Sequence, residues 1–324
     1  MRNKQPVIPS GLIILLLFIT SCGDDYPDLD FKQEMRDFVT AISGYAKGIH
    51  PGFLIIPQNG QELNTLNGDN KGSPNLEYLS VIDCIGQEDL FYGYNRDDRS
   101  TPSDETGYLT DFCDIALAAG KVILVTDYCS THSKMDDSYA KNSARGYVSF
   151  AADSRELDRV PGYPPAPFNE NTEVIDAAGK IKNFLYLINP EQYATKQDFI
   201  NAITATNYDL LIMDCFLEEE LFTAAEIESL RSKANGGRRL VVSYMSIGEA
   251  EDYRFYWDPS WSSKPPSWLD EENPDWEGNY KVWYWTDEWK QVIFGNPDAY
   301  LDIILEAGFD GVYLDIIDAF EYFE

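Results

Sequence analysis

Short apolar segments alternate with helical segments along most of this chain. Eight segments carry the β-branched and aromatic residues that favour strands. They are residues 53–56, 79–84, 121–126, 183–188, 208–213, 240–247, 281–285 and 312–315. Alternating strands and helices imply parallel strands joined by right-handed crossovers. Eight such units in 324 residues predict an α/β protein of the (β/α)8 TIM-barrel type.

The alternative for this pattern is an open, doubly wound sheet. It is disfavoured because no glycine-rich phosphate loop opens any of the expected helices. The rhythm breaks once, at residues 161–180, which are rich in proline and polar residues and read as a linker. Residues 31–324 are therefore expected to form a single barrel domain that contains this joining linker.

The N-terminus has the composition of a targeting segment. A basic start precedes apolar residues 11–20, a run too short to span a membrane. Residues 19–22 (ITSC) resemble a bacterial lipobox, so residues 1–21 are expected to be a lipoprotein signal peptide and Cys22 the lipidated residue, followed by a tether over 22–30. This predicts an exported protein at the outer membrane or cell surface, held by its lipid alone. The alternative is a plain secretory signal with an incidental cysteine.

The chain is strongly acidic, with a formal net charge of −30. Nucleic acid is therefore a poor partner, because little here would neutralise its phosphates. A cationic substrate would be attracted, although the charge can equally serve solubility alone. His50 and His132 are the only histidines and lie far apart in the sequence. We expect no metal site and no cofactor.

Four cysteines lie beyond Cys22, and an exported protein can pair them. Cys84 and Cys129 fall near the ends of neighbouring predicted strands. They are the best candidates for a disulfide.

Carboxylates stand where several predicted strands end, as at the active face of an α/β barrel. Asp315 follows the last strand directly, with Asp318 three residues on. Glu88 lies just after the second strand and ahead of Phe91 and Tyr92, so a carboxylate is placed beside aromatic rings that could stack on a sugar.

Further candidates follow the other strands, and each could equally be structural. Gln58 and Asn59 offer amides that could bind hydroxyl groups, or a simple turn. The other expected substrate contacts are Asp214, Tyr244, Glu249, Glu251, Tyr128 and Trp285. The tryptophans within 257–276 could stack on sugars, but such residues more often pack the core of a long loop.

Three segments, SYMSIGEAEDYRFYW (243–257), NPDWEGNYKVWYW (273–285) and GFDGVYLDIIDAFEYF (308–323), resemble glycoside hydrolase family 114. PGFLIIPQNGQEL (51–63) and IDCIGQEDLFYG (82–93) resemble it too. The likeness is strongest to an extracellular branch whose name once linked it to an archaeal cysteinyl-tRNA synthetase. That link is rejected because the chain has no ATP-binding motif.

The characterised activity of the resembled family is endo-α-1,4-polygalactosaminidase. The resemblance implies a TIM barrel that hydrolyses an α-linked polysaccharide, which can contain galactosamine. It carries the family's catalytic aspartate to Asp315 and its glutamate to Glu88. We assign Asp315 as nucleophile and Glu88 as general acid/base, with Asp318 as the rival for the aspartate role. A glycan-binding lipoprotein without catalysis, or a structural lipoprotein, is the alternative.

The order of these segments departs from the family. There, the QNG and EDLFYG segments normally follow the YLDIIDAFEY segment, whereas here they precede it. The sequence therefore resembles a circular permutation of the family's barrel, and a truncated or misjoined gene is the alternative. Permutation predicts that strand 312–315 pairs with strand 53–56. Asp315 and Glu88 would then have Cα atoms roughly 10 Å apart, and their carboxyl groups could approach to about 5–5.5 Å, the spacing of a retaining glycosidase.

Overall fold

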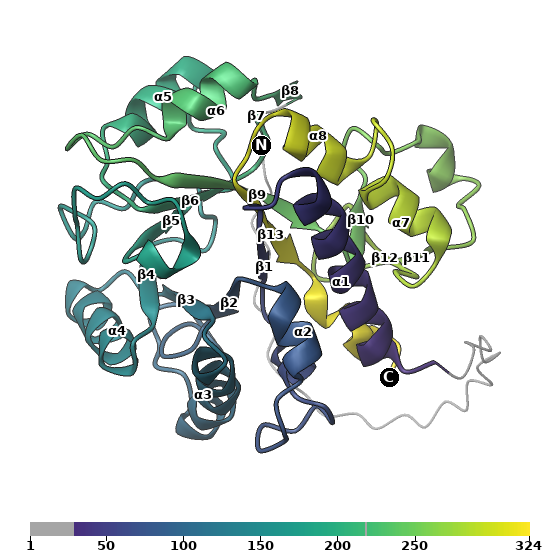
Figure 1. Ribbon diagram of the computed structural model, residues 1–324, viewed down its shortest axis with the longest axis horizontal. Coiled ribbons are helices and arrows are strands. Elements are labelled where there is room, and N and C mark those ends of the chain that lie inside the picture. Colours follow the sequence, from purple (N-terminus) through teal and green to yellow (C-terminus); the bar gives the residue numbers. More distant parts are fainter. Residues whose placement is uncertain (1–28, 218) are drawn as a thin grey trace, which may run out of the picture.

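The computed structural model describes residues 29–217 and 219–324 (Figure 1). The expected signal peptide, the lipidation site Cys22 and most of the tether lie outside the described residues. Within the part of the chain that is described, no helix combines the length and the apolar character needed to cross a membrane.

The core of the fold is a set of parallel strands in two sheets. The larger sheet has the order β1-β13-β9-β6-β5 and the smaller one β2-β3-β4. Their bounds are β1 Leu54–Pro57, β2 Cys84–Glu88, β3 Val122–Tyr128, β4 Val148–Ala152, β5 Phe184–Tyr186, β6 Leu210–Met213, β9 Leu240–Ser246 and β13 Gly311–Asp315. All their pairings are parallel. The chain is thus an α/β protein built on a parallel core, as predicted.

The helices lie outside these strands (Figure 1). They are α1 Phe31–Ile49, α2 Leu76–Val81, α3 Ser103–Ala118, α4 His132–Arg145, α5 Lys196–Thr204, α6 Ala224–Leu230, α7 Asp287–Ile293 and α8 Tyr300–Glu306, with short 3-10 helices η1 Gln61–Asn64, η2 Ala178–Lys180, η3 Pro259–Ser262 and η4 Ile317–Tyr322. In α1, residues Met35, Phe38, Val39 and Ile42 recur at helical spacing and are fully buried. Asp30 begins the helix by accepting a hydrogen bond from the Gln33 amide.

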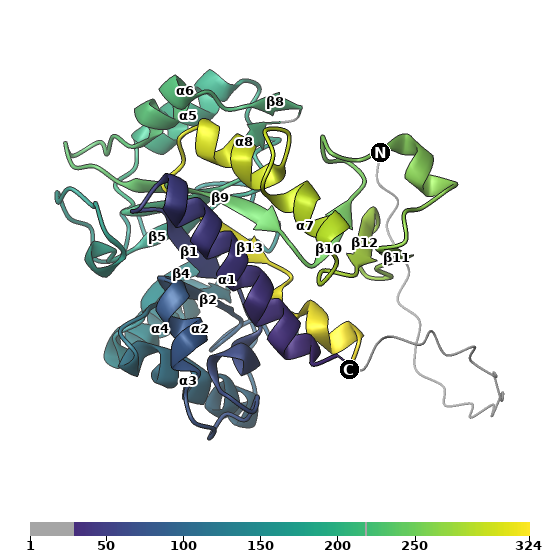
Figure 2. The same ribbon diagram turned by 45° about the vertical axis from the view of Figure 1, so that its right-hand side comes forward.

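The first and last strands pair, as the segment order predicted. β1 runs parallel to β13, with Leu54 opposite Gly311 and Pro57 opposite Leu314. The two ends of the described chain also meet outside the strands, because the start of α1 packs on η4 (Figure 2). There the Lys32 ammonium pairs with Glu324.

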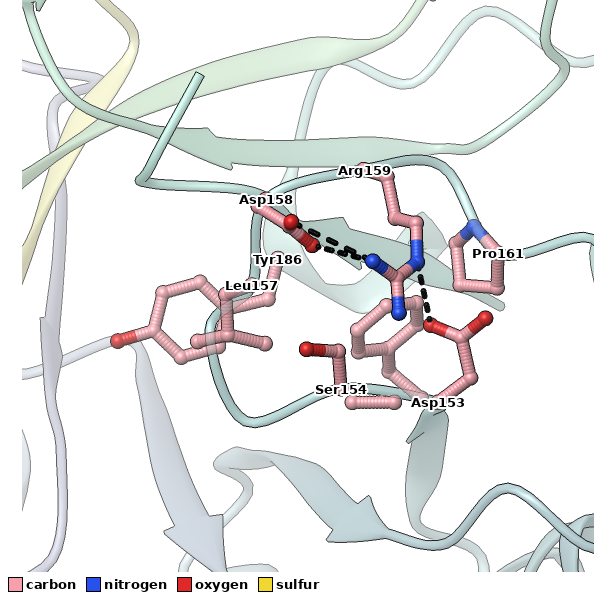
Figure 3. A pocket seen from close by; sticks show the side chains of 9 residues that line it. Asp153, Ser154, Leu157, Asp158, Arg159, Pro161 and Tyr186 are labelled. Carbon is pink, nitrogen blue, oxygen red and sulfur yellow. Dashed lines mark hydrogen bonds and ion pairs between the residues drawn. The ribbon is translucent and has the colours of Figure 1, made fainter. Parts of the chain in front are cut away.

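The two parallel sheets are joined at one side through β1 and β2. Gln58 forms a parallel bridge with Gly86, and the Asn59 amide donates to the Gly86 carbonyl at 2.9 Å. At the other side the Phe150 ring of β4 lies 5.6 Å from the Phe184 ring of β5. The loop that follows β4 crosses beside this contact, where Arg159 pairs with Asp153 and Asp158 (Figure 3).

Two of the eight predicted strands were wrong. Residues 79–81 end helix α2, which Asn75 caps by accepting from the Tyr78 amide, and the strand β2 begins only at Cys84. The segment 281–285 contributes to β12 (Asn279–Val282), which pairs antiparallel with β10 (Glu249–Glu251) and β11 (Leu269–Glu272). The eighth parallel strand is instead β4. A small hairpin, β7 (Phe216–Leu217) and β8 (Glu220–Leu221), completes the sheet structure.

The predicted Cys84–Cys129 disulfide is also wrong, because both thiols are free and buried. Cys84 begins β2 opposite Val122, whereas Cys129 follows the other end of β3. A strand rises about 3.3 Å per residue, so the two cysteines lie at opposite ends of the strands.

The proline-rich segment 161–180 is irregular but packed on the body of the protein. The Ile175 amide donates to the Arg238 carbonyl at 2.9 Å. Beneath the segment, the Lys233 ammonium lies 2.9 Å from the Asp209 carboxylate, and both side chains are fully buried. Asn171 of the segment donates to the same carboxylate at 2.9 Å. This buried pair fastens the segment to the core.

Replacing Lys233 by methionine should therefore lower the free energy of unfolding by about 3–5 kcal/mol, because Asp209 would stay buried without its cation. The measurement is urea unfolding followed by circular dichroism. Lys180→Met is the control, since its partner Asp176 is 62% exposed and exposed pairs contribute less than about 1 kcal/mol. Equal losses in the two variants would contradict the prediction.

Candidate active site

Three of the candidate side chains come from neighbouring strands. Asp315 ends β13, Gln58 follows β1, and Glu88 ends β2. Since β1 pairs with β13 and bridges to β2, Gln58 stands between the two carboxylates. This neighbour order is as predicted. Gln58 lies opposite Gly86, two residues before Glu88, and the Cα separation of Asp315 and Glu88 stays a prediction.

The backbone turns in the same way after each of these three residues. Asn59, Asp89 and Ile316 directly follow them and have φ values of 59°, 58° and 57°. Such left-handed conformations are uncommon for residues other than glycine, and for a β-branched isoleucine they are outliers. Each strand therefore ends in a sharp turn, so that Gln58, Glu88 and Asp315 are the last side chains at the strand ends.

Glu88 is held by uncharged donors. Its Oε2 atom accepts from the Gln58 amide and, at 3.1 Å, from the Asn59 amide. Its Oε1 atom accepts from the hydroxyl of Tyr128 at the end of β3. Both carboxylate oxygens are thus oriented by side chains at the ends of β1 and β3. A contact of Gln58, Asn59 or Tyr128 with substrate stays a prediction.

Asp315 is held by a tyrosine of the neighbouring strand β9. The Tyr244 hydroxyl of β9 donates to its Oδ2 atom at 2.6 Å. Burial, and next the negative charge of Glu88, raise the pKa of Asp315 to about 7. The pKa of Asp318 in η4 is also raised to about 7, by burial and by the charges of Glu321 and Glu88. The three carboxyl groups therefore interact electrostatically.

Two tyrosines fill the space beneath Gln58. The Tyr186 hydroxyl donates to the Gln58 Oε1 atom at 2.9 Å, and its ring lies 5.0 Å from that of Tyr313. The Tyr313 hydroxyl is buried without a hydrogen-bond partner among the described residues. A Cβ atom at Gly86 would lie 2.1 Å from this oxygen, so only glycine leaves room for the ring.

Asp214 and Glu251 belong to a separate ionic cluster. Arg254 lies 2.5 Å from the Asp214 carboxylate and 2.6 Å from that of Glu251. Burial raises the pKa of Asp214, and the charge of Arg254 opposes that shift. Arg254 therefore links these two carboxylates and compensates part of their charge. A contact of either carboxylate with a sugar stays a prediction.

The remaining candidates lie in packed surroundings. Glu249 accepts from Asn273 at 2.7 Å and from Tyr322 at 2.9 Å. The Trp285 ring lies 5.1 Å from Phe31 and 4.9 Å from Phe323. A contact of either residue with a sugar stays a prediction.

The tryptophan-rich excursion is mainly a packed loop. The ring of Trp261 lies 5.1 Å from Trp257 and 5.0 Å from Trp268. Trp276, by contrast, is 61% exposed. No group of three or more histidine, cysteine or acidic residues suited to a metal ion occurs in residues 29–217 and 219–324.

Comparison with known proteins finds a family model that the C-terminal part of the chain matches. Residues 186–324 match the model of glycoside-hydrolase family GH114. The matched region runs from the end of β5 through η4 and includes Asp315, Asp318 and Tyr244. Glu88 precedes it.

Three relatives are similar over about the same length of chain. An uncharacterized protein of Methanocaldococcus jannaschii is 45% identical over 133 residues, 40% of this chain and 36% of that protein. An uncharacterized protein of Thermotoga maritima is 41% identical over 120 residues, 37% of this chain and 36% of that protein. One of Deinococcus radiodurans is 39% identical over 126 residues, 39% of this chain and 38% of that protein. The similarity therefore covers little more than a third of each relative.

Several residues of the site were missed from the sequence. Tyr186 lies on a predicted strand, where the alternation of side chains could have indicated that it points inward. The same alternation does predict that Tyr313 shares the face of Asp315. Arg254 lies in an irregular loop three residues after Glu251, and its second partner, Asp214, comes from a segment 40 residues earlier, so the sequence did not indicate that it bridges the two.

Replacing Asp318 by asparagine should stabilise the fold at high pH. Because its pKa is raised to about 7 in the folded protein, folding favours the protonated form, and stability is lost as the pH rises from about 4 through 7. The variant should gain more than about 1 kcal/mol at pH 8 and almost nothing at pH 4.5.

Urea unfolding at the two pH values measures this difference. Glu228→Gln provides a control of opposite sign, because Arg238 and Arg231 lower the pKa of Glu228 to about 2. A gain for Asp318→Asn that is the same at both pH values would refute the pKa argument.

Proposed function

We propose that this protein is a glycoside hydrolase that cleaves an α-linked polysaccharide at the Glu88–Asp315 pair. The observation that carries the proposal is the placement of these carboxyl groups on either side of β1, each held by uncharged donors. The match to family GH114 supports the reaction class. Cleavage of glycosides ordinarily requires two carboxyl groups that flank the scissile bond.

In the proposed retaining reaction, Asp315 attacks the anomeric carbon while Glu88 gives a proton to the leaving oxygen. The glycosidic C–O bond breaks as the bond to Asp315 forms. Glu88 then removes a proton from water, whose oxygen attacks the same carbon and releases Asp315. Protonation of Glu88 removes a negative charge that raises the pKa of Asp315, so a proton on Glu88 favours the ionised nucleophile.

The surroundings favour a cationic sugar such as galactosamine. Near the Glu88–Asp315 pair, burial and the negative charges of Glu321 and Glu62 raise the pKa of Asp318, and burial and the charge of Glu62 also raise the pKa of Glu321. The whole chain carries a formal charge of −30. An ammonium group near Asp318 would relieve part of this repulsion. A polymer with free amino groups should therefore be cleaved better than its acetylated or neutral counterpart.

Replacing either member of the pair by its amide should abolish cleavage. Glu88→Gln and Asp315→Asn should each lower kcat by about a thousandfold or more, because each removes a charge or a proton needed in the transition state. The assay is digestion of a panel containing polygalactosamine, its acetylated form and neutral α-glycans. Glu306→Gln, an exposed change on α8, should behave as the wild type.

An aryl glycoside with an activated leaving group distinguishes the general acid from the nucleophile, because this leaving group departs without being protonated. Glu88→Gln should retain the glycosylation step on this substrate, whereas Asp315→Asn should not. Wild-type rates in both amide variants would overturn the assignment. A wild type that binds glycans but cleaves none would establish the glycan-binding protein in place of the enzyme.

We also propose that the eight parallel strands close into a TIM barrel of permuted order. Pairing of β1 with β13 supports this, as does the Phe150–Phe184 contact between β4 and β5. The family match is a single block at residues 186–324, while the QNG and EDLFYG segments precede that block. A comparison that follows chain order can match a permuted chain to the family only in one block, either before or after the point of permutation.

Export and lipidation complete the proposal, with Cys22 as the lipidated residue of an outer-membrane or surface protein. Cys22→Ser should abolish incorporation of labelled palmitate and move the protein from the membrane to the soluble fraction. Fractionation of labelled cells measures both. Ser10→Ala, which leaves the cysteine in place, is the control. Retained label in Cys22→Ser would exclude this anchor.

A further inference from the structure

Arg155 lies behind the tyrosine that holds Glu88. Its guanidinium carbon is 3.8 Å from the centroid of the Tyr128 ring. Tyr128 is 2% exposed, and its hydroxyl donates to the Glu88 Oε1 atom. Resting on the proposed function, we propose that Arg155 is a positioning residue for catalysis, which holds and polarises Tyr128 so that its hydroxyl fixes Glu88.

The guanidinium is fixed by several acceptors at once. Two of its nitrogens contact the Asp89 carboxylate at 2.8 and 3.2 Å, and Nε donates to Asp97 at 2.8 Å. The Gly93 carbonyl accepts a further hydrogen bond at 3.2 Å. A paired contact of this kind uses the planar fork of arginine and cannot be reproduced by lysine. The plane of the cation is therefore set by Asp89, the residue next to Glu88.

Gly93 leaves the space that this pairing needs. A Cβ atom there would lie 1.8 Å from Asp89 Oδ1 and 3.0 Å from the Arg155 guanidinium. Its φ of 123° also disfavours other residues. The turn after β2 is thus shaped around the Asp89–Arg155 pair.

The loop that carries Arg155 is anchored on its other side. Leu157 is 6% exposed, and its carbonyl accepts from the Ile188 amide at 3.0 Å. The Asn189 side chain donates to the Glu156 carbonyl at 2.6 Å. Figure 3 shows Leu157 beside Tyr186, with Arg159 turned toward Asp153 and Asp158 further along the loop. The backbone on the C-terminal side of Arg155 is therefore tied to β5.

The physical consequence concerns the Tyr128 hydroxyl. A cation over the face of an aromatic ring is attracted by its electrons, and the same charge favours loss of the phenolic proton. The hydroxyl therefore becomes a stronger donor to the carboxylate of Glu88. Arg155 acts through Tyr128 and need not touch the substrate.

The test compares Arg155→Met, Arg155→Lys and the control Arg159→Met, each with and without Tyr128→Phe. Arg155→Met should lower kcat about tenfold with KM changed less than twofold, and Arg155→Lys should recover only part of this. Once Tyr128→Phe is present, Arg155→Met should have no further effect on kcat. Arg159→Met, in the same loop but outside the ring contact, should match the wild type.

A second readout does not depend on cleavage. With glutamate carbon-13 labelled at the carboxyl group, the Glu88 signal is assigned by its absence in Glu88→Gln. In NMR spectra, the carboxyl chemical shift of Glu88 should change in Arg155→Met and in Tyr128→Phe. It should stay unchanged in Arg159→Met. Additive losses of kcat in the double variant, or an unmoved Glu88 signal, would overturn the positioning role. An inert wild type whose Glu88 signal still responds would instead overturn the proposed function.

Discussion

The parallel pairing of β1 with β13 is the contact on which the candidate site depends. It brings Leu54 opposite Gly311, so segments from the two ends of the described chain become adjacent. Because β1 also bridges to β2 through Gln58 and Gly86, Asp315, Gln58 and Glu88 reach one edge in that order. Neither end of the chain holds both carboxylates. The site therefore exists only when the chain ends have come together.

Two kinds of buried carboxylate stand side by side in this protein. Asp214 and Glu251 share the cation Arg254, which compensates part of their negative charge. Glu88 and Asp315 are instead held by amides and phenols, which orient them without cancelling their charge. Charge left uncompensated in a dry site raises the pKa of Asp315. That difference is the reason why the proposed function uses Glu88 and Asp315 and not Asp214 and Glu251.

Much of this arrangement followed from the sequence, because strand ends and acidic residues are both visible in it. The α/β class, the β1–β13 pairing and the neighbour order of Asp315 and Glu88 were predicted. Residues 79–81, which end helix α2, were predicted to begin a strand, because a short apolar run fits the helical and the strand periodicity alike. That misplaced boundary also led to the wrong cysteine pair. The roles of Arg254 and Arg155 could not be predicted, because Asp214 lies 40 residues from Arg254 and Asp89 lies 66 residues from Arg155, and both arginines are in irregular loops.

The left-handed turns after Gln58, Glu88 and Asp315 place a cost on the fold. In this conformation a β-branched residue such as Ile316 is strained by about 1–3 kcal/mol. Asn59 and Asp89 adopt it too, at a smaller cost, because their short polar side chains tolerate it. Glycine at these positions would relieve that strain. It would also make the turns more flexible, and the orientation of the three preceding side chains would be less fixed. Selection for thermal robustness and selection for turnover therefore pull these positions in opposite directions. Under the proposed function, a search for heat-resistant variants would reach these turns early and would return variants that cleave glycosides more slowly.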